Sequence, residues 1–257
     1  MKRLIIFTLI CVTIIAAAET NIARGGSEVI LEPDNISIGF FYSGRKAHLR
    51  TETPPGYDVV VKVAGPDEGL RLKKKGKVGG FLWMNVGEIG FENVPNLYMI
   101  GSSRGLADML VGDFFEREQI GYDAINFHST AETEEEEEFL FGEFVKLKEK
   151  EGLYSIDERS VHHRIIGDGN QEITAEFDLP AKAPLGKYQV MVYGIKNGDG
   201  TLLGTGEIQI AQSSPVAFIS SLAYRRGLLY GCLAVVIAVV AGLFTGMIFG
   251  MGKGKAH

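Results

Sequence analysis

The sequence predicts a mainly β protein with a helical insert: two immunoglobulin-like β-sandwich lobes followed by one C-terminal transmembrane helix. Two observations support this fold class. The chain has apolar segments of unequal length at its two ends, and the residues between them form short alternating segments separated by Gly and Pro turns. The expected parts, in chain order, are a signal peptide (1–18), a first sandwich lobe (19–102), a helical segment (103–152), a second, immunoglobulin-like lobe (153–212), a linker (213–226), a transmembrane helix (227–251) and a tail (252–257).

The N-terminus has the three parts of a secretory signal peptide. Lys2 and Arg3 are positively charged, residues 4–15 are apolar, and three alanines, 16–18, precede Glu19. We expect cleavage after Ala18; a short uncleaved anchor helix is the alternative.

The C-terminal apolar segment, 227–251, carries no charged residue. At about 1.5 Å per residue, a helix of this length exceeds the roughly 30 Å thickness of the hydrocarbon layer. Arg225 and Arg226 flank one side, and Lys253 and Lys255 flank the other, so the positive-inside rule does not decide the orientation. The predicted signal peptide does, because export of the middle of the chain leaves the tail in the cytoplasm.

Small residues recur at every fourth position of this segment and form one slowly winding stripe on a helix. They are Ala234, Ala238, Gly242, Gly246 and Gly250, followed by Gly254. Side chains of this size let a second membrane helix approach closely, as in the GxxxG motif. The stripe therefore predicts helix packing, either on another membrane protein or on a second copy. The alternative is that it reflects the ordinary Gly and Ala content of membrane helices.

Cysteine usage and charge exclude several classes of protein. Cys11 lies in the predicted signal peptide and Cys232 in the predicted span, so the exported part can form no disulfide and no Cys-based zinc site. The formal net charge of −6 gives no reason to expect nucleic-acid binding.

Strands are predicted where apolar residues alternate or where β-branched residues run up to a turn. The segments are Ile36–Phe40, Asp58–Ala64, a hairpin over Leu70–Met84 turning near Gly76, Leu97–Ile100, Ile173–Leu179, Lys187–Tyr193 and Leu202–Ile210. The last two are joined by Asn197-Gly198-Asp199-Gly200, the strongest turn signal in the chain. The segments Phe177–Pro180 and Pro184–Tyr188 together form a pattern that is typical of a sandwich corner.

Two segments are predicted to be helical, Ala107–Gln119 and Thr130–Glu151. In the second, Leu140, Phe144 and Leu147 share one face. The acidic residues 134–138 fall in its first turns, where negative charge suits the helix dipole. A calcium site is the less favoured interpretation, because calcium loops interleave their ligands with a Gly turn.

The basic tract from Arg71 to Lys77 places five positive charges within seven residues of the predicted hairpin. The candidate anion-binding residues are Arg71, Lys73, Lys74, Lys75 and Lys77. They could hold a small anion or contact acidic lipid headgroups. The alternative, which we favour, is a solvated edge strand that resists unwanted pairing. Trp83, the only tryptophan, is expected in the core because its neighbours are apolar.

No catalytic constellation is visible in the sequence. Gly101–Gly105 resembles a nucleophile turn only superficially, and the zinc, Walker and Gly-x-Ser-x-Gly motifs are missing. Adjacent side chains on a strand point to opposite faces, so His162 and His163 are better read as an exposed pair than as metal ligands. We therefore expect a protein that is not an enzyme and has no cofactor.

Several segments together resemble an uncharacterised bacterial family of transmembrane proteins first catalogued in alphaproteobacteria. They are Asp58–Val61 with Gly65-Pro66, Gly79–Asn85, Val94–Tyr98, Leu179-Pro180 with Gly186–Tyr188, and Leu222–Arg226 running into Leu229–Gly231. The resemblance implies a β-rich domain in the periplasm, anchored in the inner membrane by one helix. It implies no activity.

Three functional hypotheses follow. The leading one is a non-catalytic accessory module whose membrane helix packs on a transporter, another envelope complex or a second copy. The second is a periplasmic module that senses a small anion near the basic tract. The third is a eukaryotic type I membrane protein, suggested by the sequon at Asn35 and by Lys253 and Lys255 near the C-terminus.

Overall fold

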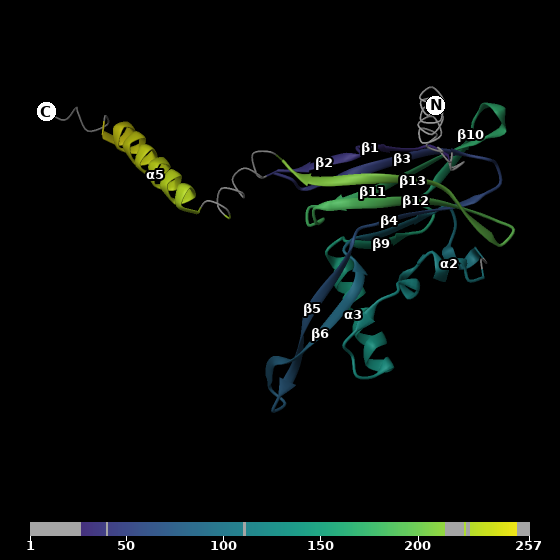
Figure 1. Ribbon diagram of the computed structural model, residues 1–257, viewed down its shortest axis with the longest axis horizontal. Helices are drawn as coiled ribbons and strands as arrows, with labels where there is room; N and C mark the ends of the chain where they lie inside the picture. The colour runs from purple at the N-terminus through teal and green to yellow at the C-terminus, as the bar shows by residue number, and fades with distance from the viewer. Residues whose placement is uncertain (1–26, 40, 110–111, 214–223, 225–226, 251–257) are drawn as a thin grey trace, which may run out of the picture.

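The computed structural model describes residues 27–39, 41–109, 112–213, 224 and 227–250. The predicted signal peptide, most of the predicted linker and the predicted tail lie outside these residues. The described part is mainly β, with few helices and one C-terminal apolar helix, which confirms the coarse fold class (Figure 1).

Two sheets form the body of the protein. The first contains, in spatial order, β1 (Val29–Glu32), β3 (Gly44–Thr53), β11 (Gln171–Pro180) and β10 (His162–Ile165). The second contains β2 (Asn35–Ile38), β13 (Asp199–Gln212), β12 (Gly186–Lys196), β4 (Asp58–Ala64), β7 (Tyr98–Ser102) and β9 (Tyr154–Asp157). All neighbours are antiparallel except the pairs β2–β13 and β7–β9.

The two sheets face each other across a buried core. Leu49 and Phe177 lie on the inner side of the first sheet, and Val61 and Val190 lie on the inner side of the second. The sheets approach closely at Gly206 of β13, where an added Cβ would lie 2.6 Å from a methyl carbon of Leu31 on β1. This body is therefore a single sandwich of two layers.

The predicted division into two sandwich lobes is corrected by the strand pairing. β3 pairs with β11, β4 with β12, and β2 with β13, so each sheet mixes strands from both halves of the chain. Alternation within a strand reports which of its faces is buried, but not which strand lies next to it.

The helical segment also differs from its prediction. The predicted helix 107–119 is replaced by a 3₁₀ turn at Leu106–Asp108 and by α2, which covers only Phe114–Arg117. Two further short elements, a 3₁₀ turn at Tyr122–Ala124 and the strand β8 (His128–Ser129), follow. The second predicted helix is confirmed as α3, Glu134–Lys150, with the Thr133 side chain accepting a hydrogen bond from the Glu136 N–H. Its buried face includes Phe144 but not Leu147, which is exposed.

A third sheet projects from the sandwich as an arm (Figure 1). Its long hairpin consists of β5 (Asp67–Val78) and β6 (Leu82–Pro95), and β8 pairs with the base of β6. The hairpin turns at Gly79 and Gly80, both with positive φ, rather than near Gly76 as predicted. Glycine adopts this conformation without the steric cost that other residues meet.

The C-terminal helix α5 spans Gly227–Gly250 and lies apart from the sandwich (Figure 1). Its window Tyr230–Met247 is long and apolar enough to cross a membrane, and none of that window is buried within the chain. It is the one helix of this kind among the described residues.

Candidate interaction surface

The β5–β6 hairpin, residues 67–95, is called the arm below, and its outer part, residues 75–86, is called the arm tip. The base of the arm is well supported. Leu70 and Leu72 on β5 lie opposite Phe91 and Ile89 on β6, and this side of the arm packs toward the core. Phe91 is fully buried and lies beside Phe144 of α3, with ring centroids 5.1 Å apart.

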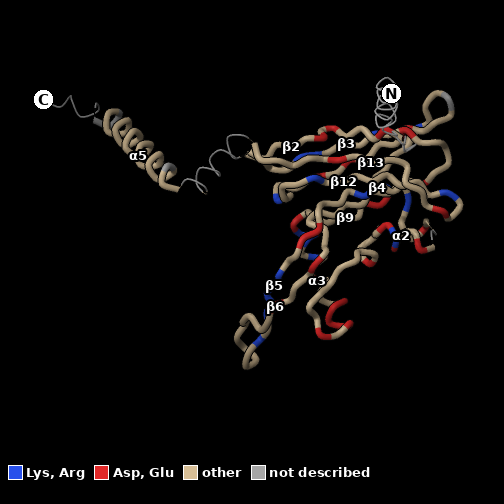
Figure 2. Tube along the Cα trace, viewed as in Figure 1, with Lys and Arg blue, Asp and Glu red and all other residues tan. Residues whose placement is uncertain are grey.

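Two ion pairs connect the arm to α3. Lys148 Nζ of α3 lies 2.7 Å from Glu68 Oε1 at the start of β5. Farther out, Lys74 pairs with Glu136 in the first turn of α3. Hydrogen bonding to Lys74 holds the pKa of the Glu136 carboxyl below its usual value. The acidic start of α3 thus faces the basic strand, and Figure 2 shows the two charge types side by side.

The arm tip extends beyond these supports and exposes a group of large apolar side chains. Phe81 is 83% exposed and Trp83 is 64% exposed. The other members of the group are Val78, Leu82, Met84 and Val86, each about half exposed. So many exposed apolar side chains at one end of a hairpin mark a contact with a protein, a membrane or a ligand. The prediction that Trp83 lies in the core is therefore wrong.

The basic residues lie on this same arm but do not converge on one point. Because side chains alternate along a strand, Arg71, Lys73, Lys75 and Lys77 share one face of β5, and Lys74 points to the other. Lys74 is already paired with Glu136, and Lys73 lies directly opposite Glu88 of β6. At the tip, Lys77 Nζ lies 5.3 Å from the centroid of the Trp83 ring.

The register places the apolar and basic side chains of the arm tip on different faces. Lys77 pairs with Trp83, whereas Val78 pairs with Leu82 and Gly76 with Met84. An extra residue in β6, marked by the register shift at Lys74 and Lys75, places Val86 over Gly76. One face is therefore apolar and continues the buried base of the arm, while the other carries the lysines and Trp83.

A depression beside the base of the arm contains Arg71. Its lining also includes Glu88 and Glu92, and its volume is about 440 Å³. The two carboxylates make this depression a poor cradle for an anion. The predicted anion-binding set is thus distributed along a strand rather than gathered into a cavity.

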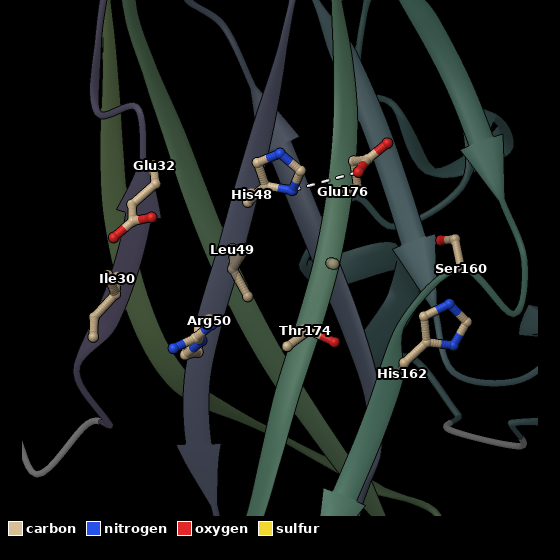
Figure 3. A pocket seen from close by; sticks show the side chains of 10 residues that line it. Ile30, Glu32, His48, Leu49, Arg50, Ser160, His162, Thr174 and Glu176 are labelled. Carbon is tan, nitrogen blue, oxygen red and sulfur yellow. Dashed lines mark ion pairs between the residues drawn. The ribbon is translucent and has the colours of Figure 1, made fainter.

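A depression of about 560 Å³ lies on the outer face of the four-stranded sheet (Figure 3). His48 Nδ1 lies 3.4 Å from Glu176 Oε2, and His162 lines the depression from β10. Ser160 donates its hydroxyl to the carbonyl of Asp157, at 2.6 Å. Among the described residues, no group of three His, Cys, Asp or Glu side chains is placed to hold a metal ion. His162 and His163 are both exposed on β10.

The small-residue stripe lies on α5, away from the sandwich. Ala234, Ala238, Gly242 and Gly246 are exposed, and Gly250 ends the helix. A Cβ added at Gly242 or Gly246 would meet nothing within 4 Å. The geometry leaves the stripe open to another helix, and its predicted role in packing stays a prediction.

Within the described residues, a β-rich domain is accompanied by one helix of membrane length, which defines the class of membrane-anchored proteins. Residues 28–250 match the model of the family described as "Putative transmembrane protein (Alph_Pro_TM)", and the chain belongs to this family. The expected family resemblance is confirmed.

Other comparisons add little. No curated protein matches the chain. A crystal structure of a putative membrane anchored protein from Corynebacterium diphtheriae matches 77% of this chain at 13% identity, with a TM-score of 0.24. The match spans 37% of that protein's length.

Proposed function

We propose that this protein is a non-catalytic accessory module, anchored in the bacterial inner membrane with its β domain in the periplasm. In this proposal the arm is the binding surface, and α5 packs on a transporter, another envelope complex or a second copy. The observation that carries the proposal is the exposed apolar arm tip, because six large apolar side chains stand in solvent on a supported hairpin.

The absence of enzymatic activity is part of the proposal. In the depression of the four-stranded sheet, His48 is exposed and paired with Glu176. A nucleophile held by a general base is the arrangement that acyl or phosphoryl transfer requires. Ser160 instead donates its hydroxyl to a backbone carbonyl.

A mild-detergent pull-down of the tagged full-length protein tests the module. Two variants separate its two surfaces: Phe81→Ser with Leu82→Ser on the arm tip, and Gly242→Leu with Gly246→Leu on α5. The matched control for the helix is Val236→Leu with Val240→Leu, because these exposed residues lie on the opposite side of α5 from the stripe. A stoichiometric partner lost in either variant and kept in the control supports the proposal. Recovery of the same proteins with every variant contradicts it.

The alternative is a module that senses a small anion near the basic face of β5. It has less support, because Lys74 is paired and Arg71 lies beside two carboxylates. Thermal unfolding of the full-length protein in detergent, with and without millimolar phosphate or sulfite, tests this alternative. A rise in melting temperature that Lys75→Gln with Lys77→Gln abolishes would favour it.

A further inference from the structure

We propose that the arm tip inserts into the interface of the bilayer that α5 spans, with its lysines among anionic lipid headgroups. This inference rests on the proposed function, since it takes the arm as the binding surface and names lipid as the occupant. Topology, reach and side-chain chemistry support it independently.

The arm and the membrane tether leave the sandwich at the same end. β12 is antiparallel to both β13 and β4, so β13 and β4 run in the same direction. At one level of the sheet, Gln189 of β12 pairs with Ala64 on one side and with Glu207 on the other. β4 then continues into the arm, and β13 continues toward α5 (Figure 1). The end of the sandwich that carries the arm is therefore the end tied to the membrane.

The arm is long enough to reach the bilayer. The chain between the end of β13 and the start of α5 comprises residues 213–226, which span at most about 50 Å when fully extended. β5 has 12 residues, which corresponds to a strand of about 40 Å. The tether and the arm are thus of comparable length, so the tip can meet that membrane at a high effective concentration.

The chemistry of the outer arm fits a lipid interface. Residues 71–87 include five Lys and Arg and no Asp or Glu, although the whole chain carries a formal charge of −6. Trp83 is an aromatic side chain of the kind found at the headgroup level, Phe81 is a purely apolar ring, and the lysines next to them are positioned to attract anionic headgroups. Lys can also extend its charged end into water while its methylene groups lie along the apolar layer.

The size and shape of the tip favour a bilayer over a protein as its occupant. A standard protein interface uses about 20–30 residues on each side, whereas the arm tip, residues 75–86, is a narrow hairpin end. Lipid needs no matching pocket, and the apolar face of Leu82 and Met84 together with Phe81 at the turn can enter it directly. A second copy or a protein partner is an outcome of the test.

The test uses Trp83 as a reporter, because it is the only tryptophan in the chain. Full-length protein is reconstituted into vesicles of phosphatidylcholine and phosphatidylglycerol, with ordinary or brominated acyl chains, and Trp83 emission is measured with and without iodide. We expect brominated lipid to quench Trp83 and iodide to quench it at least about twofold less than a solvent-exposed tryptophan. The matched reporter is the double variant Trp83→Phe with Phe139→Trp, since Phe139 is exposed on α3 and outside the arm tip.

The role of the charges is tested in the same vesicles. Lys73→Gln with Lys75→Gln and Lys77→Gln should weaken the quenching by brominated lipid, and pure phosphatidylcholine should do the same. Lys74→Gln is the matched control, because Lys74 is paired with Glu136 and should leave the quenching unchanged.

The lipid inference is overturned if two results occur together. Iodide quenches Trp83 as strongly as it quenches the Phe139→Trp reporter, and brominated lipid does not quench Trp83. If the arm-tip variant still loses a partner in the pull-down, the proposed function holds and a protein occupies the tip. If only the α5 variant loses a partner, the arm has no binding role and the accessory function depends on the helix alone. If neither variant loses a partner, both proposals fail.

Discussion

The ammonium group of Lys62 donates a hydrogen bond to the backbone carbonyl of Glu118, on the side of the six-stranded sheet that faces away from the sandwich core. Beside it, the Tyr98 hydroxyl donates to the carbonyl of Gln119 at 2.8 Å and accepts from the N–H of Gly121, also at 2.8 Å. These bonds fix residues 118–121 against the central strands. They explain why β4 and β7 are buried on both faces, although the four-stranded sheet covers only one of these faces.

We expect Lys62 to make stability depend on alkaline pH. Burial lowers the pKa of its ammonium group from 10.5, because desolvation disfavours the charged form. The unfolded chain therefore binds more protons than the folded one between the lowered pKa and about 10.5, so stability rises with pH across this window. Replacing Lys62 by Met should remove this contribution. Urea unfolding of the full-length protein in detergent measures the unfolding free energy of both proteins. The value for the wild type should increase relative to that of the Lys62→Met variant as pH rises from 7 toward 10.5. A difference that stays constant would contradict a lowered pKa of Lys62.

The ion pair between Lys148 and Glu68 should be important for holding the arm to α3. Lys148 is 4% exposed, and its ammonium lies 5.5 Å from the centroid of the Phe144 ring. Glu68→Gln leaves this buried charge without a counter-ion, which we expect to cost about 2–3 kcal/mol of unfolding free energy, less than for a fully buried pair because Glu68 is partly exposed. Lys148→Met removes the charge itself and should cost less than Glu68→Gln.

The exposed pair Glu143–Lys146 on the same helix is the control for this prediction. Glu143→Gln should change the unfolding free energy by less than about 1 kcal/mol, because solvent screens both partners. Equal losses for Glu68→Gln and Glu143→Gln in denaturant unfolding would show that burial of Lys148 does not matter.

The strands that sequence analysis predicted best are those with a clear local signal. β4 has the bounds that its β-branched run indicates, and the β12–β13 hairpin turns at Asn197 and Gly198, both with positive φ. β3 was missed although it is 10 residues long. Its inner face includes Ala47 and two threonines, which give a much weaker apolar alternation than Val or Ile does.

The local sequence pattern gave wrong predictions where the burial of a residue depends on a segment far away in the chain. The predicted helix 107–119 contains apolar residues such as Phe114, but Phe114 covers the outer face of the sheet from the four-residue helix α2 rather than from one side of a long helix. The prediction for Trp83 is wrong in the opposite direction, because a residue expected in the core is exposed. Its apolar neighbours resemble a core strand, yet no described element covers the outer half of the arm. An interaction surface and a core strand have the same composition, so only the structure distinguishes them.

Gly200 at the start of β13 should be intolerant of a side chain. An added Cβ would lie 2.3 Å from the ring of Phe114, which packs on this glycine and on Tyr193. We expect Gly200→Ala to displace Phe114 and lower the unfolding free energy by about 1–3 kcal/mol. Gly87→Ala on β6 is the control, because nothing lies within 4 Å of its added Cβ. Equal changes in melting temperature for Gly200→Ala and Gly87→Ala would contradict the predicted packing.

The last prediction concerns Tyr188, whose hydroxyl donates to the carbonyl of Pro184 where the chain enters β12. The ring is fully buried, and burial raises the pKa of this hydroxyl from 10.0 to about 12. The hydrogen bond needs the neutral form, so Tyr188→Phe should cost about 1 kcal/mol at neutral pH. A raised pKa means that this stabilisation is complete below pH 10 and is lost as pH rises toward 12. Urea unfolding of both proteins should therefore show their difference shrinking above pH 10, and a difference that stays the same or grows would contradict a role for the neutral hydroxyl.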